Sequence, residues 1–215
     1  MYLAPLSGKA RVLSHPRLGC VITPESDRGV PEGMPWGADC GLKVARGADR
    51  GDLERYLDWL ETRPYDRSTC LYAVAPDVLG DAAATWERAA PLLPLIKGLG
   101  YRPALVAQDG FDPQLVAWDA FDVLFIGGKP RVPRNLEWKR AEHGGYAAIA
   151  EGKKRGKWVH VGRVNGGPFL RQLAAAGADS ADGSILTYSP EKCWPLIVSW
   201  FDQLTEQPSM LLEAR

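Results

Sequence analysis

Polar residues and glycines that suit chemistry on a nucleobase follow several apolar segments of this sequence. They are, in chain order, Asp39, Asp77, Gln108, the pair Gly127 and Gly128, Gly162 with Arg163, and Asp182. Carboxylate and amide groups can pair with the edge of a planar heterocycle, and glycines let the backbone approach a flat ligand closely. Two carboxylates on opposite sides of a sugar carbon supply a nucleophile and a proton carrier, as in retaining glycosyl transfer. Asp182 and Asp39 are the candidates for these two roles.

Short apolar runs rich in β-forming residues precede these polar positions and are typical of buried strands. Six such runs lie at 17–24, 70–77, 102–110, 121–128, 157–165 and 178–184, and a weaker one lies at 34–41. Helical spacing occurs at 81–100, 144–156, 166–177 and 191–207. Pro91 and Pro94 should kink or split the first of these helices.

The alternation of strands and helices predicts a parallel sheet covered by helices. We expect an α/β protein with a compact (β/α) TIM-like barrel, complete or incomplete, and keep a doubly wound sheet as the alternative. In both architectures the carboxyl ends of the strands meet at one edge, so the polar residues would surround a common pocket. The length of 215 residues predicts one domain over 1–215, which would carry this pocket, with loosely held ends at 1–16 and 208–215.

Composition narrows the classes of partner. The 26 Lys and Arg balance the 26 Asp and Glu, so contact with a polyanion must come from a local patch. The four cysteines are far apart without a C-x-x-C pair, which argues against a zinc ribbon and a disulfide framework. No stretch approaches the roughly 20 apolar residues of a membrane span, and the first residues lack the pattern of a signal peptide. We therefore expect a cytoplasmic protein without a metal or membrane contact.

Taken in order, these segments resemble those of the tRNA-guanine transglycosylase superfamily, whose members exchange guanine for a deazaguanine in an intact polynucleotide. GADSADG at 177–183 is similar to the family's nucleophile segment, and WGADCG at 36–41 is similar to the segment of its second catalytic Asp. The segments that resemble the family's base-binding strand ends are VAPD at 74–77, LVAQDG at 105–110, LFIGG at 124–128 and VHVGRVN at 159–165. The matches cover most of the chain, from Arg17 to Ser189.

The resemblance implies a pentosyltransferase of the queuine tRNA-ribosyltransferase type. Asp182 would attack C1′ of a guanosine, and an incoming 7-deazaguanine of the preQ0 type, deprotonated with help from Asp39, would displace the enzyme from the covalent intermediate. The positions that match the family's base-binding residues are Asp77, Gln108, Gly127, Gly128 and Gly162. The resemblance implies no metal, ATP or other cofactor.

Two departures from the family bear on the substrate. The clustered cysteines and His of the tRNA enzymes' C-terminal zinc subdomain have no counterpart, because Cys193 stands alone, and SILTYSP at 184–190 replaces the usual Pro-Thr-Arg. The short, zinc-free form is more similar to the DNA-modifying branch of bacteriophages and bacterial genomic islands, called DpdA. We therefore expect DNA rather than tRNA as the polymer, in a bacterial or phage-infected cell. A homodimer or an accessory DNA-modification protein stays open.

Basic and aromatic residues near the predicted rim suit a polynucleotide. The segment KPRVPRNLEWKR at 129–140 follows a strand end, and Arg163 follows the next one. The residues expected to contact phosphates are Lys129, Arg131, Arg134, Lys139 and Arg163. Trp36 is expected to sandwich the base, which must leave the helix stack to enter such a pocket.

Simpler structural interpretations apply to the same residues. Asp182 and Asp77 could be turn or capping residues, and the basic segment could be a solvated surface. His160 is expected to be a core or lining histidine, because no metal-ligand spacing relates it to His15 or His143. Two other functions also stay open: a nucleoside deoxyribosyltransferase or N-glycosidase acting on free nucleosides, and a catalytically silent nucleic-acid-binding barrel.

Overall fold

Eight parallel strands form a closed barrel in which each strand pairs with its neighbours in chain order and β8 pairs with β1. The computed structural model describes residues 1–6, 8–41, 50–129 and 137–205. The strands are β1 (Tyr2–Ala4), β2 (Leu18–Ile22), β3 (Trp36–Ala38), β4 (Cys70–Val74), β5 (Pro103–Ala107), β6 (Val123–Ile126), β7 (Trp158–Val161) and β8 (Ser180–Asp182). The prediction of a TIM-like barrel is confirmed.

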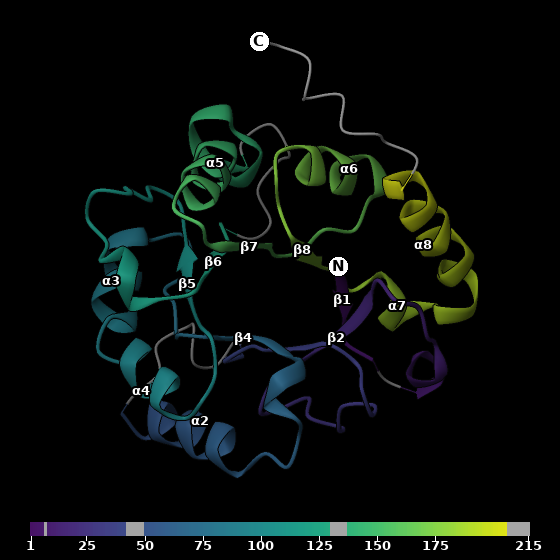
Figure 1. Ribbon diagram of the computed structural model, residues 1–215, viewed down its shortest axis with the longest axis horizontal. Helices are drawn as coiled ribbons and strands as arrows, with labels where there is room; N and C mark the ends of the chain where they lie inside the picture. Colours follow the sequence, from purple (N-terminus) through teal and green to yellow (C-terminus); the bar gives the residue numbers. More distant parts are fainter. Residues whose placement is uncertain (7, 42–49, 130–136, 206–215) are drawn as a thin grey trace.

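Helices form an outer layer around the strands, as Figure 1 shows. They are α2 (Arg50–Thr62), α3 (Ala82–Ala89), α4 (Leu93–Gly98), α5 (Ala147–Lys154), α6 (Gly167–Ala175), α7 (Ile185–Tyr188) and α8 (Pro190–Thr205). Short 3₁₀ turns η1 (Gly8–Val12), η2 (Arg67–Thr69), η3 (Trp118–Ala120) and η5 (Trp138–Arg140) and the π-turn η6 (Glu142–Tyr146) complete the layer. The described connection 108–122 between β5 and β6 contains η3 without an α-helix, so the outer layer is less regular than the barrel.

The amino-terminal segment corrects one expectation. Within the segment 1–16, Tyr2, Leu3 and Ala4 are not loosely held, because they form β1 and are fully buried. The strand is only three residues long, which is too short for its period to be read from the sequence. The predicted loose end at 208–215 lies outside the described residues.

The helices follow from local sequence. The predicted helix at 81–100 is split into α3 and α4, and Pro94 lies in the first turn of α4, where a missing N–H costs nothing. Helix α2 is an additional element that the predicted helices do not include. Leu53, Leu57 and Leu60 recur with helical spacing along it, and Leu60 is fully buried.

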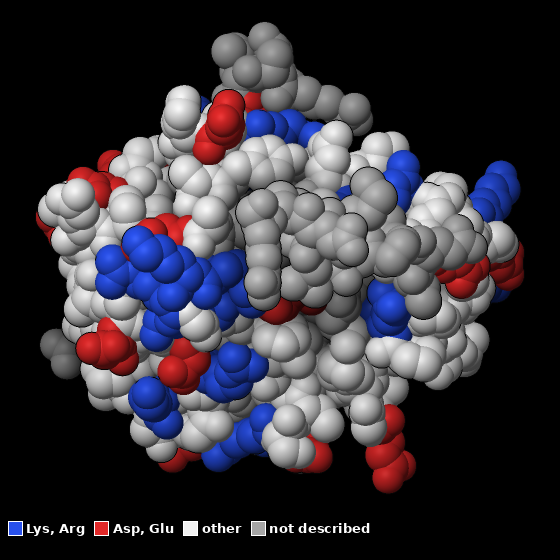
Figure 2. All heavy atoms as spheres, turned by 45° about the horizontal axis from the view of Figure 1, so that its top comes forward, with Lys and Arg blue, Asp and Glu red and all other residues white. Residues whose placement is uncertain are grey.

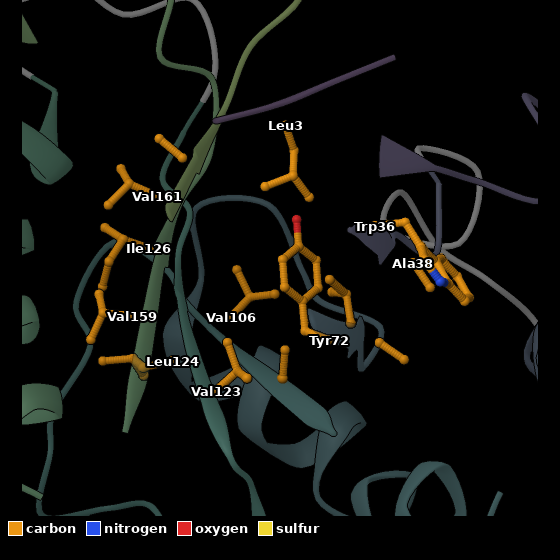
Figure 3. Packing of buried hydrophobic residues seen from close by; sticks show 14 of the residues in the cluster. Leu3, Trp36, Ala38, Tyr72, Val106, Val123, Leu124, Ile126, Val159 and Val161 are labelled. Atoms are coloured by element: carbon orange, nitrogen blue, oxygen red, sulfur yellow. The ribbon is translucent and has the colours of Figure 1, made fainter. Parts of the chain in front are cut away.

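The barrel interior is filled by large side chains beneath the strand ends. The Tyr72 ring stands between Leu3 and Val106 in Figure 3. Its space depends on Gly37, where an added Cβ would lie 2.5 Å from the Tyr72 ring, and the β3–β4 register shifts between Trp36 and Gly37. This packed interior leaves open space at the carboxyl ends of the strands, where TIM barrels carry their sites.

Closure by β1 predicts a large effect of truncating Leu3, which is 0% exposed. Leu3→Ala should lower the free energy of unfolding by about 2–5 kcal/mol, because the buried side chain leaves a cavity inside a packed barrel. Urea denaturation measures this, with Leu115→Ala as the matched control, since Leu115 is 67% exposed. Equal effects of the two substitutions would show that β1 is not part of the core.

Candidate active site

The carboxyl ends of the strands surround a cavity of about 150 Å³. The predicted site residues that line it are Asp39, Asp77, Gln108, Gly127, Gly128, Lys139, Gly162, Arg163 and Asp182. Other lining residues include Thr23, Val74, Leu79, Val106 and Phe125. Barrel closure explains the convergence, because every strand delivers its last residues to the same rim. Two acids of predicted catalytic role and two polar groups of predicted base-binding role therefore share one concave site.

Asp182 ends β8, and its carboxylate is held at both oxygens. Oδ1 lies 3.0 Å from Nε2 of His160, and Oδ2 accepts a hydrogen bond from the backbone N–H of Arg163 at 3.3 Å. The Asp182 side chain is 19% exposed, so it can contact a ligand in the cavity while these two contacts fix its orientation. A fixed and accessible carboxylate has the geometry that nucleophilic catalysis requires.

Arg163 adopts a backbone conformation that is unfavourable for a side-chain-bearing residue. Its φ is +60°, in the left-handed region, which costs about 1–3 kcal/mol outside glycine. This conformation points the Arg163 N–H at Asp182 and brings its guanidinium to 3.5 Å from the carbonyl oxygen of Gly128. The strained residue therefore connects the ends of β6 and β8 across β7.

Asp39 follows β3 and is half-buried at the edge of the cavity. Its Oδ1 accepts the backbone N–H of Gly41 at 2.9 Å. Burial raises the pKa of Asp39 to about 6, and the charges of Asp77 and Asp182 add to the rise, while the Gly41 hydrogen bond opposes it. A carboxyl with this pKa can both give and take a proton near neutral pH.

Asp77 and Gln108 form a buried pair at the ends of β4 and β5. The Gln108 Nε2 donates to Asp77 Oδ2, and the Gln108 Oε1 accepts the backbone N–H groups of Gly80 at 3.0 Å and Gly128 at 2.9 Å. Burial raises the pKa of Asp77, and the Gln108 hydrogen bond acts in the opposite direction. The backbone thus fixes the Gln108 amide, which leaves one amide hydrogen and the other Asp77 oxygen for a ligand.

Glycines keep the cavity open. An added Cβ at Gly127 would lie 2.7 Å from Val106 and 2.9 Å from Gln108 Nε2. One at Gly162 would lie 2.8 Å from the Phe125 ring and 3.4 Å from Asp182 Oδ1. Side chains at these positions would displace the groups that the site is built from.

The predicted phosphate contacts are arranged differently from one another. The Lys139 ammonium donates to the carbonyl of Gly162 at 3.0 Å, and burial lowers the pKa of Lys139, so this side chain points inward and holds the end of β7. Lys129 is exposed, and Arg131 and Arg134 lie outside the described residues. Figure 2 shows Lys and Arg side chains gathered in a patch on one face, with acidic side chains among and around them. A local basic surface is therefore present even though the net charge of the whole chain is zero.

Trp36 does not lie at the cavity, so its predicted base-stacking role is wrong. It is the first residue of β3, at the amino end of the barrel, and is fully buried. Its Nε1 donates to the carbonyl of Asp66 at 3.1 Å, and its ring packs edge-on against Tyr65 and Tyr101. In Figure 3 it points away from Tyr72. Trp36 begins the three-residue strand β3 and Asp39 follows its last residue, so the two residues lie at opposite ends of the barrel.

Phe125 is a site residue that the sequence analysis did not name, and His160, expected there as a core or lining histidine, contacts Asp182. They are partners in the β6–β7 register, and their ring centroids lie 4.6 Å apart. Phe125 lines the cavity, and His160 contacts Asp182 beneath it. Each lies two residues before a cavity glycine, Gly127 or Gly162, so the period of two could have assigned both to the inner face.

Within residues 1–6, 8–41, 50–129 and 137–205, no group of three His, Cys, Asp or Glu side chains is placed to hold a metal ion. The helices of this part of the chain are also too short or too polar to cross a bilayer.

The raised pKa of Asp39 predicts a pH-dependent stability difference. The folded state holds this proton more tightly than the unfolded state, so its contribution to stability is present below pH 3.8 and is lost as the pH rises through about 6. Asn at position 39 does not titrate, so Asp39→Asn avoids this loss. The free energy of unfolding of the variant should therefore rise relative to that of the wild type between pH 4 and pH 7. Urea denaturation at both pH values tests this, with the exposed Asp119→Asn as control. A difference that does not change with pH would contradict it.

The fixed Gln108 amide predicts a second effect. Gln108→Glu keeps the acceptor for Gly80 and Gly128 but sets a carboxylate against Asp77, so it should lower the free energy of unfolding by about 2 kcal/mol at pH 7. The loss should shrink at pH 5, because one carboxyl of the pair can then hold a proton and donate it. Gln114→Glu, on an exposed position, is the matched control in the same denaturation experiment. Equal stabilities of both variants would show that the pair is not formed.

Comparisons with known proteins identify no family. No protein-family model matches the chain, and no curated protein matches it. Among solved structures, the chain is similar to the Bacillus subtilis YkuI protein, which has an EAL domain and was crystallised with its substrate c-di-GMP and calcium. The similarity covers 80% of this chain and 44% of that chain, with a TM-score of 0.43 and 14% sequence identity. The chain thus spans less than half of that protein, and a likeness of this size carries no inference about activity.

Proposed function

We propose that this protein is an enzyme that exchanges guanine for a 7-deazaguanine base in DNA through a covalent intermediate on Asp182. The observation that carries the proposal is the pairing, in one cavity, of a carboxylate fixed at both oxygens with a second carboxyl whose pKa is about 6. These are the two groups that double displacement at a sugar carbon needs. The sequence resemblance to transglycosylases supports the same assignment.

In the first step an oxygen of Asp182 attacks C1′ of the target nucleotide. The new oxygen–carbon bond forms as the bond from C1′ to the ring nitrogen of guanine breaks, and the electron pair goes to that nitrogen. Asp39 in its protonated form supplies the proton that the departing base takes up. The product is a glycosyl ester on Asp182 and free guanine.

In the second step the incoming base reverses these events. Its ring nitrogen attacks C1′, the ester bond to Asp182 breaks, and Asp39 takes the proton that the new base releases. Two inversions leave the sugar configuration unchanged, and both acids return to their starting states. A pKa of about 6 suits Asp39 for both directions of proton transfer.

The paired Asp77 and Gln108 suit the edge of guanine. The free Asp77 oxygen can accept from the ring N–H and the exocyclic amine, and the remaining Gln108 amide hydrogen can donate to the carbonyl oxygen of the base. Gly127 and Gly162 leave the space for a flat ligand, and Phe125 offers it an aromatic face. A 7-deazaguanine has the same edge and would bind in the same way.

The choice of DNA is supported by the sequence features that resemble the DNA-modifying branch. Arg163 at the cavity and the exposed Lys129 can contact phosphates even though the net charge of the whole chain is zero. A cavity of about 150 Å³ admits a base only after it has left the helix stack. Single-stranded DNA should therefore be a better substrate than duplex.

Incorporation of radiolabelled guanine into polymer tests the proposal. The purified protein is incubated with labelled guanine and, separately, single-stranded DNA, duplex DNA and tRNA. We expect label in DNA, and a loss of about 10³-fold or more with Asp182→Asn, because the nucleophile is gone. Asp119→Asn, a matched substitution on the surface, should keep the wild-type rate.

Each other outcome corrects a stated part of the proposal. Label in tRNA alone would overturn the choice of polymer and keep the chemistry. Guanine release from DNA without uptake would indicate an N-glycosidase. No label in any polymer, or undiminished uptake by a folded Asp182→Asn variant, would contradict base exchange on Asp182.

A further inference from the structure

A chain of hydrogen bonds runs behind Asp182 along β7 and β8. Trp158 Nε1 lies 2.9 Å from Ser180 Oγ, Ser180 Oγ lies 2.8 Å from His160 Nδ1, and His160 Nε2 lies 3.0 Å from Asp182 Oδ1. Residues at alternate positions of the two strands share the inner face of the barrel, and His160 is opposite Ser180 in the register. The pairing of the strands thus builds the chain directly.

The chemistry of the chain orients its protons. An indole N–H can only donate, so Ser180 Oγ accepts from Trp158 and has its own proton to give. That proton can go to His160 Nδ1, which places the imidazole proton on Nε2, facing Asp182 Oδ1. A carboxylate oxygen requires a donor at this distance, so the two ends of the chain agree.

The surroundings of His160 favour a neutral ring. It is fully buried, and burial lowers its pKa, while Asp182 acts in the opposite direction and the amino group of Met1 adds to the lowering. The Tyr72 hydroxyl lies 3.2 Å from Nε2, and the Phe125 ring packs against the imidazole. Burial keeps the pKa of Tyr72 well above its usual value, so neither aromatic neighbour adds a charge.

Ser180, His160 and Asp182 are the residue types of a Ser–His–Asp triad, but here the hydroxyl lies at the buried end of the hydrogen bonds and the carboxylate lies at the cavity. Ser180 is 3% exposed, its oxygen accepts from Trp158, and it does not line the active-site cavity. Asp182 lies at the cavity. A nucleophile must reach the substrate, so the group served by this chain is the carboxylate and not the hydroxyl.

We infer that His160 is a positioning residue for Asp182: Trp158 and Ser180 hold it as the neutral Nε2–H tautomer, and it donates one hydrogen bond to Asp182 Oδ1. This inference rests on the proposed role of Asp182 as nucleophile. The bond orients the carboxylate toward C1′ without introducing a positive charge that would bind it as an ion pair. The imidazole keeps its proton throughout. Formation and breakdown of the ester therefore need no proton transfer along the hydrogen bonds between Trp158, Ser180, His160 and Asp182.

The tautomer can be measured without any activity. Nuclear magnetic resonance of protein labelled with ¹⁵N in its histidines separates a protonated from an unprotonated ring nitrogen. We expect His160 to show a protonated Nε2 and an unprotonated Nδ1 from pH 6 to pH 8, with the exposed His143 as internal reference. Ser180→Ala should leave Nε2 protonated, because Asp182 Oδ1 still accepts from it, and should shift the Nδ1 resonance, because that nitrogen loses its donor. A protonated Nδ1 in the wild type, with Tyr72 donating to Nε2, would overturn the inference.

Kinetics tests the effect on Asp182. In the exchange assay His160→Leu should lower kcat about 10-fold or more with little change in the KM for guanine, and His160→Gln, which restores a donor, should recover part of the loss. His143→Leu is the control and should match the wild type. A kcat within twofold of wild type for a folded His160→Leu variant would contradict the positioning role. A wild type that shows the expected tautomer and no exchange would overturn the proposed function alone.

Discussion

The pairing of β1 with β8 closes the barrel, and the candidate site depends on that closure. Leu3 is opposite Asp182 in the register, and the N–H of Gly183 donates to the carbonyl of Leu3 at 3.1 Å. On its other side β8 pairs with β7, which brings His160 to the same carboxylate. In an open sheet with this strand order, the ends of β3 and β8 would be separated by the width of the sheet. Closure is what lets Asp39 and Asp182 face one cavity.

Three acids around a small cavity pose an electrostatic problem, since burial penalises each charge and the charges repel one another. Within the described residues, the three carboxyl groups are stabilised mainly by hydrogen bonds from uncharged groups. These are the backbone N–H groups of Gly41 and Arg163, the Gln108 amide and the His160 ring. Within this part of the chain, no Lys or Arg forms an ion pair with Asp39, Asp77 or Asp182. The carboxylates therefore stay available to a neutral base and a sugar carbon.

The sequence predicted the barrel and most of the cavity lining, because each strand is a distinct apolar run and its polar terminus follows directly. It could not predict β1, whose three residues are buried by closure rather than marked by a pattern. Trp36 was misplaced because it begins the three-residue strand β3, whereas Asp39 follows the end of that strand. The inward direction of the Lys139 side chain could not be predicted either, since a long side chain beside a loop can turn toward the protein or toward solvent. The contact of His160 with Asp182 could not be predicted, because it depends on how β7 pairs with β8.

The covalent intermediate is the central claim, and intact-mass measurement tests it most directly. The protein is mixed with a single-stranded deoxyoligonucleotide that contains guanine, without added base, and analysed under denaturing conditions. The account predicts an adduct with the mass of protein plus oligonucleotide minus guanine, mapping by proteolysis to the peptide that contains Asp182 and absent from Asp182→Asn. An adduct on another residue, or base exchange by the wild type with no adduct at any time, would contradict it.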